Sequence, residues 1–401
     1  MEHQTSPRSV TYRLLLETKG KAGKLFQIAG ACRFVWNAAL ERNRAEYQTA
    51  KIFGTPKPSV SFFSLGKQFT ELRRKTPWLM ELPAREIRYT LKYQADAWQK
   101  TFKQGAGFPK RKTRARSTPS FTIPEQVNLK DNRLFIPKTG RVTLRGNNPY
   151  EGCEPKLATI KYLAGKWYCS VLYDVPADRV KQPAQTDAVG IDRNVSGIAL
   201  STEELKHLPG RDTKRLEIRR RRYQRRMARQ VKGSRRRNIT KARVARISRT
   251  LGNVRKNWAH QTTRRIADKY ETVVIEDLNI PGMTASAKGT ETEPGKNVRQ
   301  KAGLNREILA SAWGNFENKL AYKCGTLIKV EPAYTSQTCS RCGNIDKESR
   351  KDRDFHCVKC GHKDHADINA AKNILALGIG ATARGGALSS DTPLIRENET
   401  G

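Results

Sequence analysis

Three carboxylates lie at points in the sequence where side chains can converge. Asp192 follows the apolar residues 189–191 of a predicted strand, Glu276 ends the apolar run "VVIE", and Asp367 opens the predicted helix "DINAAKNILAL". Unpaired carboxylates would repel one another and any phosphate, whereas Mg²⁺ prefers carboxylate and water oxygens as ligands. Two such ions about 3.5–4 Å apart can cleave a phosphodiester. We therefore expect these three acids to hold two catalytic Mg²⁺ ions. A turn or cap role is the alternative for each of them, as for Asp277.

Four of the eight cysteines form two Cys-x2-Cys pairs, "CSRCG" at 339–343 and "CVKCG" at 357–361, with 14 residues between the pairs. Each pair presents two thiolates to one tetrahedral ion, and the glycine that follows permits a tight turn. The spacing predicts a structural zinc ribbon with Cys339, Cys342, Cys357 and Cys360 as ligands. The nearby histidines are expected to cap, contact phosphate or face solvent, and the other cysteines are expected to be ordinary; these are His356, His362, His365, Cys32, Cys153, Cys169 and Cys324.

The charge of the chain favours a nucleic-acid partner. Lys and Arg number 77 against 38 Asp and Glu, which gives a formal net charge of +39. Such an excess attracts phosphate polyanions; a ribosome-like RNA scaffold and a membrane-surface binder are the alternatives. Residues 211–250 alone hold 18 Lys or Arg and two acids, and they predict two basic helices broken near Gly233. The predicted nucleic-acid contacts are Arg219, Arg220, Arg222, Arg225, Arg226, Arg236 and Arg243 in this segment, with Lys110 and Arg111 in "GFPKRK".

Apolar spacing predicts the elements around these residues. Residues 9–17 alternate like a strand, and two helical stripes indicate a small helical domain from about 18 to 104. Residues 119–176 are strand-like and include a hairpin that turns at Ala164–Gly165, which predicts a small β-barrel that also contains the first strand. The two stripes are Leu25, Ile28, Cys32, Val35 and Ala39, then Ile87, Leu91, Ala95, Trp98 and Phe102; the hairpin face is Trp167, Cys169, Val171 and Tyr173.

The loop 281–302 has no apolar periodicity and is expected to be mobile. A helix should follow it, with Leu309, Trp313, Phe316 and Leu320 in register. The tail 378–401 is expected to be disordered. No apolar run approaches the roughly 18 residues of a membrane span, and the N-terminus lacks the apolar region of a signal peptide. We therefore expect a reducing compartment.

Six segments carry a family resemblance: "VGIDRNVSGIALS", "VVIEDLNI", "YTSQTCSRCG", "CVKCGHKDHADINAAKNIL" and, more weakly, "CRFVWNAAL" and "GFPKRK". In order and spacing the chain resembles the transposon-encoded TnpB proteins, RNA-guided nucleases related to compact type V CRISPR effectors, over about residues 20–377. The resemblance implies a multidomain α+β fold. A split RuvC-type (RNase H-like) nuclease domain with an inserted zinc ribbon would follow a small wedge β-barrel that carries an inserted helical recognition domain.

The expected domains are then the first wedge strand (1–17), the recognition domain and basic linker (18–118), the rest of the wedge barrel (119–182), the RuvC-like domain with a basic helical region at 211–270 (183–334), the zinc ribbon (335–362), the last RuvC helix (363–377) and the tail (378–401). The family's catalytic acids carry over to Asp192, Glu276 and Asp367, and its zinc ligands to the four ribbon cysteines. Asn194 stands where many relatives have glycine, and Asn tolerates left-handed turn geometry.

The resemblance implies a metal-dependent DNA endonuclease that cuts beside a short adjacent motif, using one site for both strands. Its expected partners are a guide RNA, a double-stranded DNA target and the RNA–DNA heteroduplex, without a membrane and as a monomer on one RNA. The loop 281–302 is a candidate gate of the site. The alternatives are a miniature type V CRISPR effector with array-derived guides, a non-cleaving RNA-guided DNA-binding regulator, and a zinc-ribbon RNA-binding protein without a guide.

Overall fold

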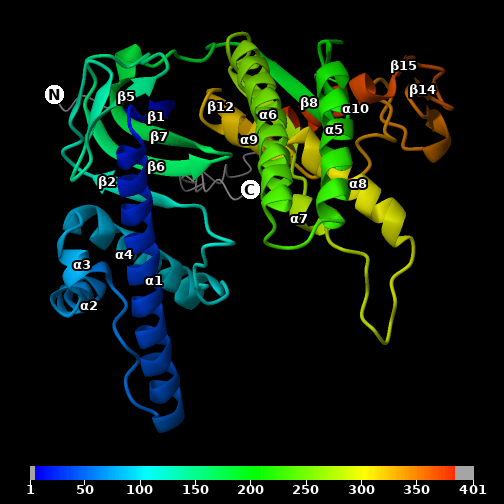
Figure 1. Ribbon diagram of the computed structural model, residues 1–401. Helices are drawn as coiled ribbons and strands as arrows, with labels where there is room; N and C mark the ends of the chain where they lie inside the picture. Colours follow the sequence, from blue (N-terminus) through cyan, green and yellow to red (C-terminus); the bar gives the residue numbers. More distant parts are fainter. Residues whose placement is uncertain (1–4, 209, 384–401) are drawn as a thin grey trace. The chain divides into compact units, whose positions relative to one another are not determined.

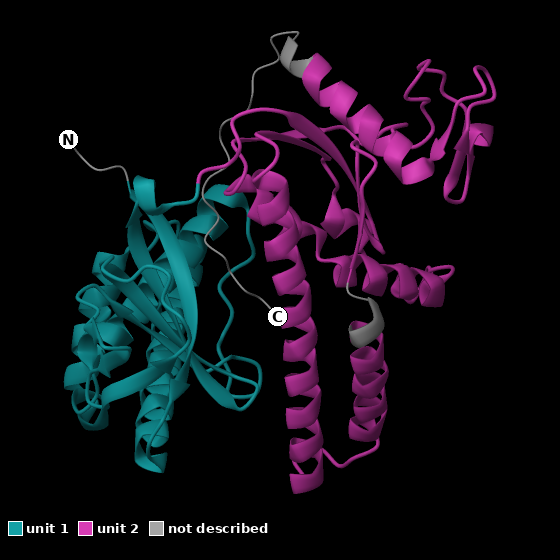
Figure 2. Cartoon of the chain, turned by 90° about the horizontal axis from the view of Figure 1, so that it is seen from above, with its two compact units in different colours: residues 1–181 teal, residues 182–401 magenta. Residues whose placement is uncertain are grey.

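The computed structural model describes residues 5–208 and 210–383. The chain forms two compact units, residues 1–181 and 182–401, which are coloured separately in Figure 2. Within the described residues, no helix combines the length and the apolar character needed to cross a bilayer.

The first unit is built on a seven-stranded antiparallel sheet with the order β2-β6-β7-β1-β5-β4-β3. The first strand of the chain, β1, lies at its centre between β7 and β5, and the edges are β2 and β3, so closure into a barrel stays a prediction. The hairpin prediction is confirmed, since Leu163 pairs with Lys166 across Ala164 and Gly165, both with positive φ. The strands are β1 (Thr5–Leu15), β2 (Ser120–Pro124), β3 (Leu129–Lys130), β4 (Arg133–Ile136), β5 (Gly140–Arg145), β6 (Pro155–Leu163) and β7 (Lys166–Pro176), followed by the short helix η1 (Ala177–Arg179).

Four helices stand between β1 and β2 in the chain: α1 (Lys19–Phe53), α2 (Phe62–Arg74), α3 (Pro77–Met80) and α4 (Ala84–Gln104). The two predicted stripes on α1 and α4 are buried, with one exception. Phe102 is 44% exposed, because it lies in the last turn of α4, where it stacks on Tyr47 and Trp98 at the margin of the core.

The second unit is built on a five-stranded sheet with the order β10-β9-β8-β11-β12. Strands β8, β11 and β12 run parallel, and β9 and β10 continue from β8 as an antiparallel meander. The carboxyl ends of the neighbouring strands β8 and β11 therefore lie next to each other, at the same end of the strands. The strands are β8 (Ala188–Asn194), β9 (Gly197–Leu200), β10 (Leu205–His207), β11 (Thr272–Glu276) and β12 (Thr326–Val330).

Helices cover both faces of this sheet. On one face α10 (Ala366–Ala383) packs on β8 and β11 (Figure 1). On the other face, residues of α6 (Arg235–Ala267) and α9 (Trp313–Ala321) share a core with apolar side chains of β8 and β11, among them Ile266, Phe316 and Val273. The basic helix α5 (Gly210–Ala228) packs along α6, and the predicted break is confirmed because Gly233 has φ +87° between the two helices.

The segment after β11 differs from its prediction. Helices α7 (Ile280–Met283) and α8 (Val298–Ser311) enclose residues 284–297, so the irregular loop is shorter than 281–302. The single helix expected through Leu309 and Leu320 is two helices, because Ala312 adopts φ +57° between α8 and α9, and Leu309 is 62% exposed.

The zinc-ribbon segment contains the helix η2 (Lys347–Ser349) and a three-stranded sheet of β13 (Arg350–Lys351), β14 (Asp354–His356) and β15 (Lys363–His365). The tail prediction is wrong in its first residues, since α10 continues to Ala383. A Cβ at Gly378 would lie 2.5 Å from a methyl of Val274, so this glycine lets α10 pack closely on β11. The rest of the predicted tail, 384–401, lies outside the described residues.

Candidate active site and zinc centre

Two of the three predicted acids lie side by side at the carboxyl ends of β8 and β11 in the second sheet. Strands β8 and β11 are parallel and in register up to Ile191 and Ile275, so the next residues, Asp192 and Glu276, follow at the same level. Glu276 is 8% exposed, and its Oε1 accepts a 2.7 Å hydrogen bond from the hydroxyl of Thr335. The parallel pairing thus places two carboxylates next to each other at the strand ends.

The third acid comes from the first turn of α10, and a glycine allows its approach. A Cβ at Gly190 would overlap the carbonyl oxygen of Ala371 and lie 2.7 Å from the backbone nitrogen of Leu375. Only a glycine lets α10 lie this close to β8. Asp367 precedes Ala371 by one helical turn and Gly190 precedes Asp192 by two strand residues, so the close packing brings both acids to the same face.

Asn194 and His365 hold the start of α10. The Nδ2 of Asn194 donates to Asp367 Oδ2 at 2.9 Å, while its Oδ1 accepts from the backbone nitrogens of Ser196 and Gly197. The Nδ1 of His365 accepts from the backbone nitrogen of Asp367 at 3.2 Å, which agrees with the capping role considered for this histidine. Asn194 therefore does not serve a left-handed turn: it ends β8 and orients a carboxylate.

The three carboxylates interact electrostatically. Burial raises the pKa of Asp192 to about 7, and the charges of Glu276 and Asp367 add to this rise, while Arg350 and Arg193 oppose it. A carboxyl with this pKa is costly to ionise without a cation nearby. Acids from two strand ends and a helix start supply the oxygen ligands that Mg²⁺ prefers. The donor set therefore fits divalent metal ions.

These carboxylates are more widely spaced than ligands of a single ion would be. Among the described residues, the only group of three or more potential metal ligands whose donor atoms all lie within 4.8 Å of one another is the cysteine cluster. Acids that share two ions about 3.5–4 Å apart must span a larger distance than the ligands of one ion. As they stand, the three carboxylates therefore do not all surround one common ion position.

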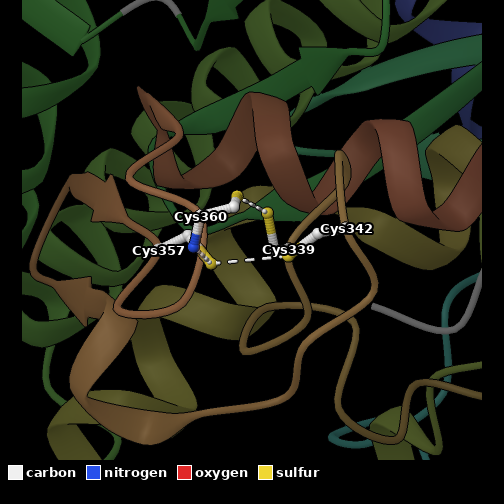
Figure 3. A group of neighbouring side chains, drawn as sticks. All are labelled: Cys339, Cys342, Cys357 and Cys360. Atoms are coloured by element: carbon white, nitrogen blue, oxygen red, sulfur yellow. Dashed lines mark hydrogen bonds between the residues drawn. The ribbon is translucent and has the colours of Figure 1, made fainter.

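The zinc prediction agrees with the positions of the four cysteines (Figure 3). The sulfurs of Cys339 and Cys360 are 3.7 Å apart, and those of Cys342 and Cys357 are 3.6 Å apart. Zn–S bonds of about 2.3 Å in a tetrahedron place the sulfurs roughly 3.8 Å apart. The glycine after each pair has a positive φ, +73° at residue 343 and +68° at residue 361. The four thiolates thus fit one structural zinc ion.

The ribbon is fastened to the helix that carries Asp367. Asn369 is fully buried, accepts from the backbone nitrogen of Ser340 at 2.9 Å and donates to the carbonyl of Thr338 at 2.7 Å. One turn later, Asn373 donates to the carbonyls of Thr335 and Thr338. Both asparagines belong to the motif "DINAAKN", but sequence reasoning gave them no role.

Two arginines near the acids were also missed. Arg350, on β13 of the ribbon, lies 3.3 Å from Asp367 Oδ1. Arg193, next to Asp192, has a completely enclosed side chain and pairs with Glu317 at 2.9 Å. The position of Arg193 directly after a candidate catalytic acid was the one available signal; nothing in the sequence distinguished Arg350 from other surface arginines.

The predicted nucleic-acid contacts are in two places. Those on α5 and α6 are exposed, apart from the half-buried Arg220, and Tyr223 lies within 6 Å of Arg219 on its own helix and Arg243 on the other. Lys110 and Arg111 are exposed in the first unit, where Arg111 pairs with Glu41 at 2.5 Å. Accessible guanidinium groups along a helix hairpin are suited to binding phosphates.

Comparison with known proteins adds an independent line of evidence. Residues 170–287 match a family described as a probable transposase, residues 8–51 an associated helix-turn-helix domain, and residues 313–374 the Cas12f1-like TNB domain. The segment 8–51 corresponds here to most of β1 followed by most of one long helix, α1.

Relatives extend over nearly the whole chain. The "Putative RNA-guided DNA endonuclease InsQ" of Escherichia coli K12 is 33% identical over 92% of both chains. A "Putative RNA-guided DNA endonuclease" of Streptomyces pristinaespiralis is 29% identical over 95% of this chain and 92% of its own. The cryo-EM structure of a Cas12f1–sgRNA–target DNA complex matches the fold with a TM-score of 0.55 at 14% identity, over 92% of this chain and 98% of that chain. On the motifs around the three acids, the zinc ribbon and the full-length match to the Escherichia coli protein, the chain belongs to the TnpB family.

Proposed function

We propose that this protein is the RNA-guided DNA endonuclease of a transposon. It cuts target DNA beside a short adjacent motif by metal-dependent hydrolysis of phosphodiesters. The observation that carries the proposal is the convergence of Asp192, Glu276 and Asp367, drawn from two strand ends and a helix start and mutually repelling without a cation. Full-length relatives carry the name RNA-guided DNA endonuclease, which supports the same activity.

The fold supports a RuvC-type, RNase H-like nuclease domain. Its three parallel strands are extended by an antiparallel meander and flanked by helices on both faces, with the acids at one sheet edge. The zinc ribbon is inserted between β12 and α10, and the first unit supplies the wedge and recognition parts. The expected boundaries, 1–17, 18–118, 119–182, 183–334, 335–362 and 363–377, belong to this proposal, with the last helix extended to Ala383.

Each side chain of the site has a defined task in this proposal. Asp192, Glu276 and Asp367 would hold two Mg²⁺ ions, and the chemistry that such ions would supply is activation of water and stabilisation of the leaving oxygen. Thr335 and Asn194 fix the rotamers of Glu276 and Asp367 through hydrogen bonds. Arg350 neutralises Asp367 before metal and substrate bind. Zinc, bound by the four cysteines, keeps the ribbon folded.

Binding and sequence choice are separate tasks. The arginines of α5 and α6 bind the phosphate backbone of the nucleic acid, and Lys110 and Arg111 are further contacts. Base pairing between the guide RNA and the target strand selects the DNA sequence. The partners are a guide RNA, double-stranded DNA and their heteroduplex, and the protein acts as a monomer on one RNA in the prokaryotic cytoplasm. The segment 281–302, which follows Glu276, is the candidate gate. Deleting residues 286–296 without an effect on cleavage would rule that role out.

The proposal is tested by purifying the protein from cells that express its native locus and sequencing the RNA that copurifies. One structured scaffold with a variable end is expected, and a variable end that matches the transposon flank separates this reading from a CRISPR effector with array-derived guides. A heterogeneous RNA pool without a shared scaffold would contradict a guide. A non-cleaving regulator is disfavoured because all three acids are present.

A further inference from the structure

The residue next to the first catalytic acid lies on the opposite face of the sheet. Successive side chains of a strand point to opposite faces, so Asp192 faces α10 and Arg193 faces α9. The Arg193 side chain has no exposed surface. A buried arginine is costly unless its charge and its hydrogen bonds are satisfied, so its partners indicate why it is there.

Arg193 adds a contact between β8 and the end of β11. The register between β8 and β11 ends at Ile191 and Ile275, one residue before the acids, and Glu276 is paired on its other side with Val330 of β12. Arg193 Nη2 donates to the backbone carbonyl of Glu276, which links this residue to β8 just beyond the paired residues. Its Nη1 donates to Glu317 Oε2 on α9 at 2.9 Å.

A chain of alternating charges extends from this arginine. Glu317 also pairs with Lys329 of β12 at 2.5 Å, and Lys329 lies 3.5 Å from Asp277. Asp277 is the residue after Glu276, and its backbone nitrogen donates to the carbonyl of Val330 at 2.8 Å. Glu276 is therefore held by Arg193 at its carbonyl and by β12 through its pairing with Val330, and Glu317 of α9 contacts both Arg193 and Lys329.

We propose that Arg193, held by Glu317, is a positioning residue that fixes the Glu276 backbone relative to β8 and so sets the spacing of Asp192 and Glu276 for metal binding. This inference rests on the proposed nuclease function. It gives the buried ion pair a task beyond stability, because the pair orients a ligand-bearing strand end from the face of the sheet opposite α10. Changes in such supporting contacts typically lower metal affinity or activity about 10–100-fold.

The test separates positioning from folding through three variants. In Arg193→Met, Glu317 loses one of its two cationic partners. In Arg193→Met with Glu317→Leu, no unpaired charge is left between these elements, and such replacements are often neutral for stability; Lys329 is 43% exposed and retains Asp277. Arg264→Met is a matched control, because Arg264 also pairs with an acid, Asp268, and donates to a carbonyl, that of Gln182, near the opposite end of β11.

Three quantities are measured: the melting temperature, the Mg²⁺ concentration for half-maximal cleavage by the guide-RNA complex, and Mn²⁺ binding to the protein by electron paramagnetic resonance, with Asp192→Asn as the blank. We expect the double variant to melt near wild type yet to need about 10-fold more Mg²⁺ and to bind Mn²⁺ about 10-fold more weakly. Arg264→Met should leave both metal readouts unchanged.

Two results would overturn the inference: wild-type metal dependence in the double variant, or a metal shift in Arg264→Met of the same size. Failure of the proposed function is a distinct outcome, since the wild-type complex would then not cleave DNA at any Mg²⁺ concentration. A shift in Mn²⁺ binding would support the positioning role even in that case.

Discussion

Replacing Gly190 by alanine tests whether close packing of α10 on β8 sets the catalytic geometry. The added Cβ would overlap the carbonyl oxygen of Ala371 and lie 2.7 Å from Leu375 N and 2.8 Å from Leu375 Cβ. Ordinary contacts between carbon atoms are about 3.5 Å, so α10 must withdraw by roughly 1 Å. Asp367, one turn before Ala371, must move with the helix, whereas Asp192 stays with the strand.

A misplacement of about 1 Å can lower a catalysed rate about 100-fold, and overpacking costs about 1–3 kcal/mol of stability. We therefore expect Gly190→Ala to remain folded at 25 °C, to melt several degrees lower and to cleave guide-matched DNA about 100-fold more slowly at saturating Mg²⁺. The assay is single-turnover cleavage by the assembled RNA complex, with RNA and DNA binding measured in parallel.

Gly380→Ala is the matched control, because it lies on the same helix and an added Cβ meets nothing within 4 Å. It should cleave at the wild-type rate. Cleavage by Gly190→Ala at the wild-type rate would refute the reasoning, since it would mean that the spacing between β8 and α10 does not fix Asp367. Equal losses in both variants would likewise point to a general effect of alanine.

Three further predictions concern charge and metal. The pKa of Asp192, about 7 when folded against 3.8 as the ordinary value, means that without added Mg²⁺ the folded state loses stability, on the order of 3–4 kcal/mol, as pH rises from about 4 to 7. Asp192→Asn should therefore melt above wild type at pH 8 but not at pH 4; the same difference at both pH values would contradict this. Cys339→Ser should abolish zinc binding in elemental analysis and lower cleavage, whereas Cys153→Ser should do neither; full cleavage by a zinc-free protein would contradict the anchoring of α10. Changing Arg222, Arg225 and Arg226 together to Gln should weaken RNA binding and reduce its salt slope by up to about 3, and an unchanged slope would exclude these contacts.

Site residues whose role follows from their own strand or from short sequence spacing could be predicted from the sequence. Asp192 and Glu276 end apolar strands, and two Cys-x2-Cys pairs specify a zinc ribbon by spacing alone. The contacts among distant segments were not predictable, because they depend on tertiary packing. Glu317 is 124 residues from Arg193, and Arg350 meets Asp367 only after the ribbon folds.

Local backbone geometry accounts for the other differences. The apolar spacing through Leu309 and Leu320 suits one helix, yet Ala312 adopts a left-handed conformation. Such a conformation usually occurs at a glycine, and residue 312 is an alanine, so nothing in the sequence indicated the break. The segment after Leu377 contains Gly378 and Gly380, which weaken helix propensity. Helix α10 nevertheless continues through it, because Gly378 packs against Val274 and tertiary contact outweighs the local preference.

In this account, the protein cleaves DNA that pairs with its guide RNA, at a site formed by Asp192, Glu276 and Asp367. The most direct test is to incubate the copurified RNA complex with plasmids that carry or lack a sequence matching the guide, with and without Mg²⁺. Wild type should linearise only the matched plasmid and only with Mg²⁺, while Asp192→Asn, Glu276→Gln and Asp367→Asn should still bind it without cutting. Binding of matched DNA without cleavage by wild type, or cleavage by Asp192→Asn at the wild-type rate, would contradict the claim.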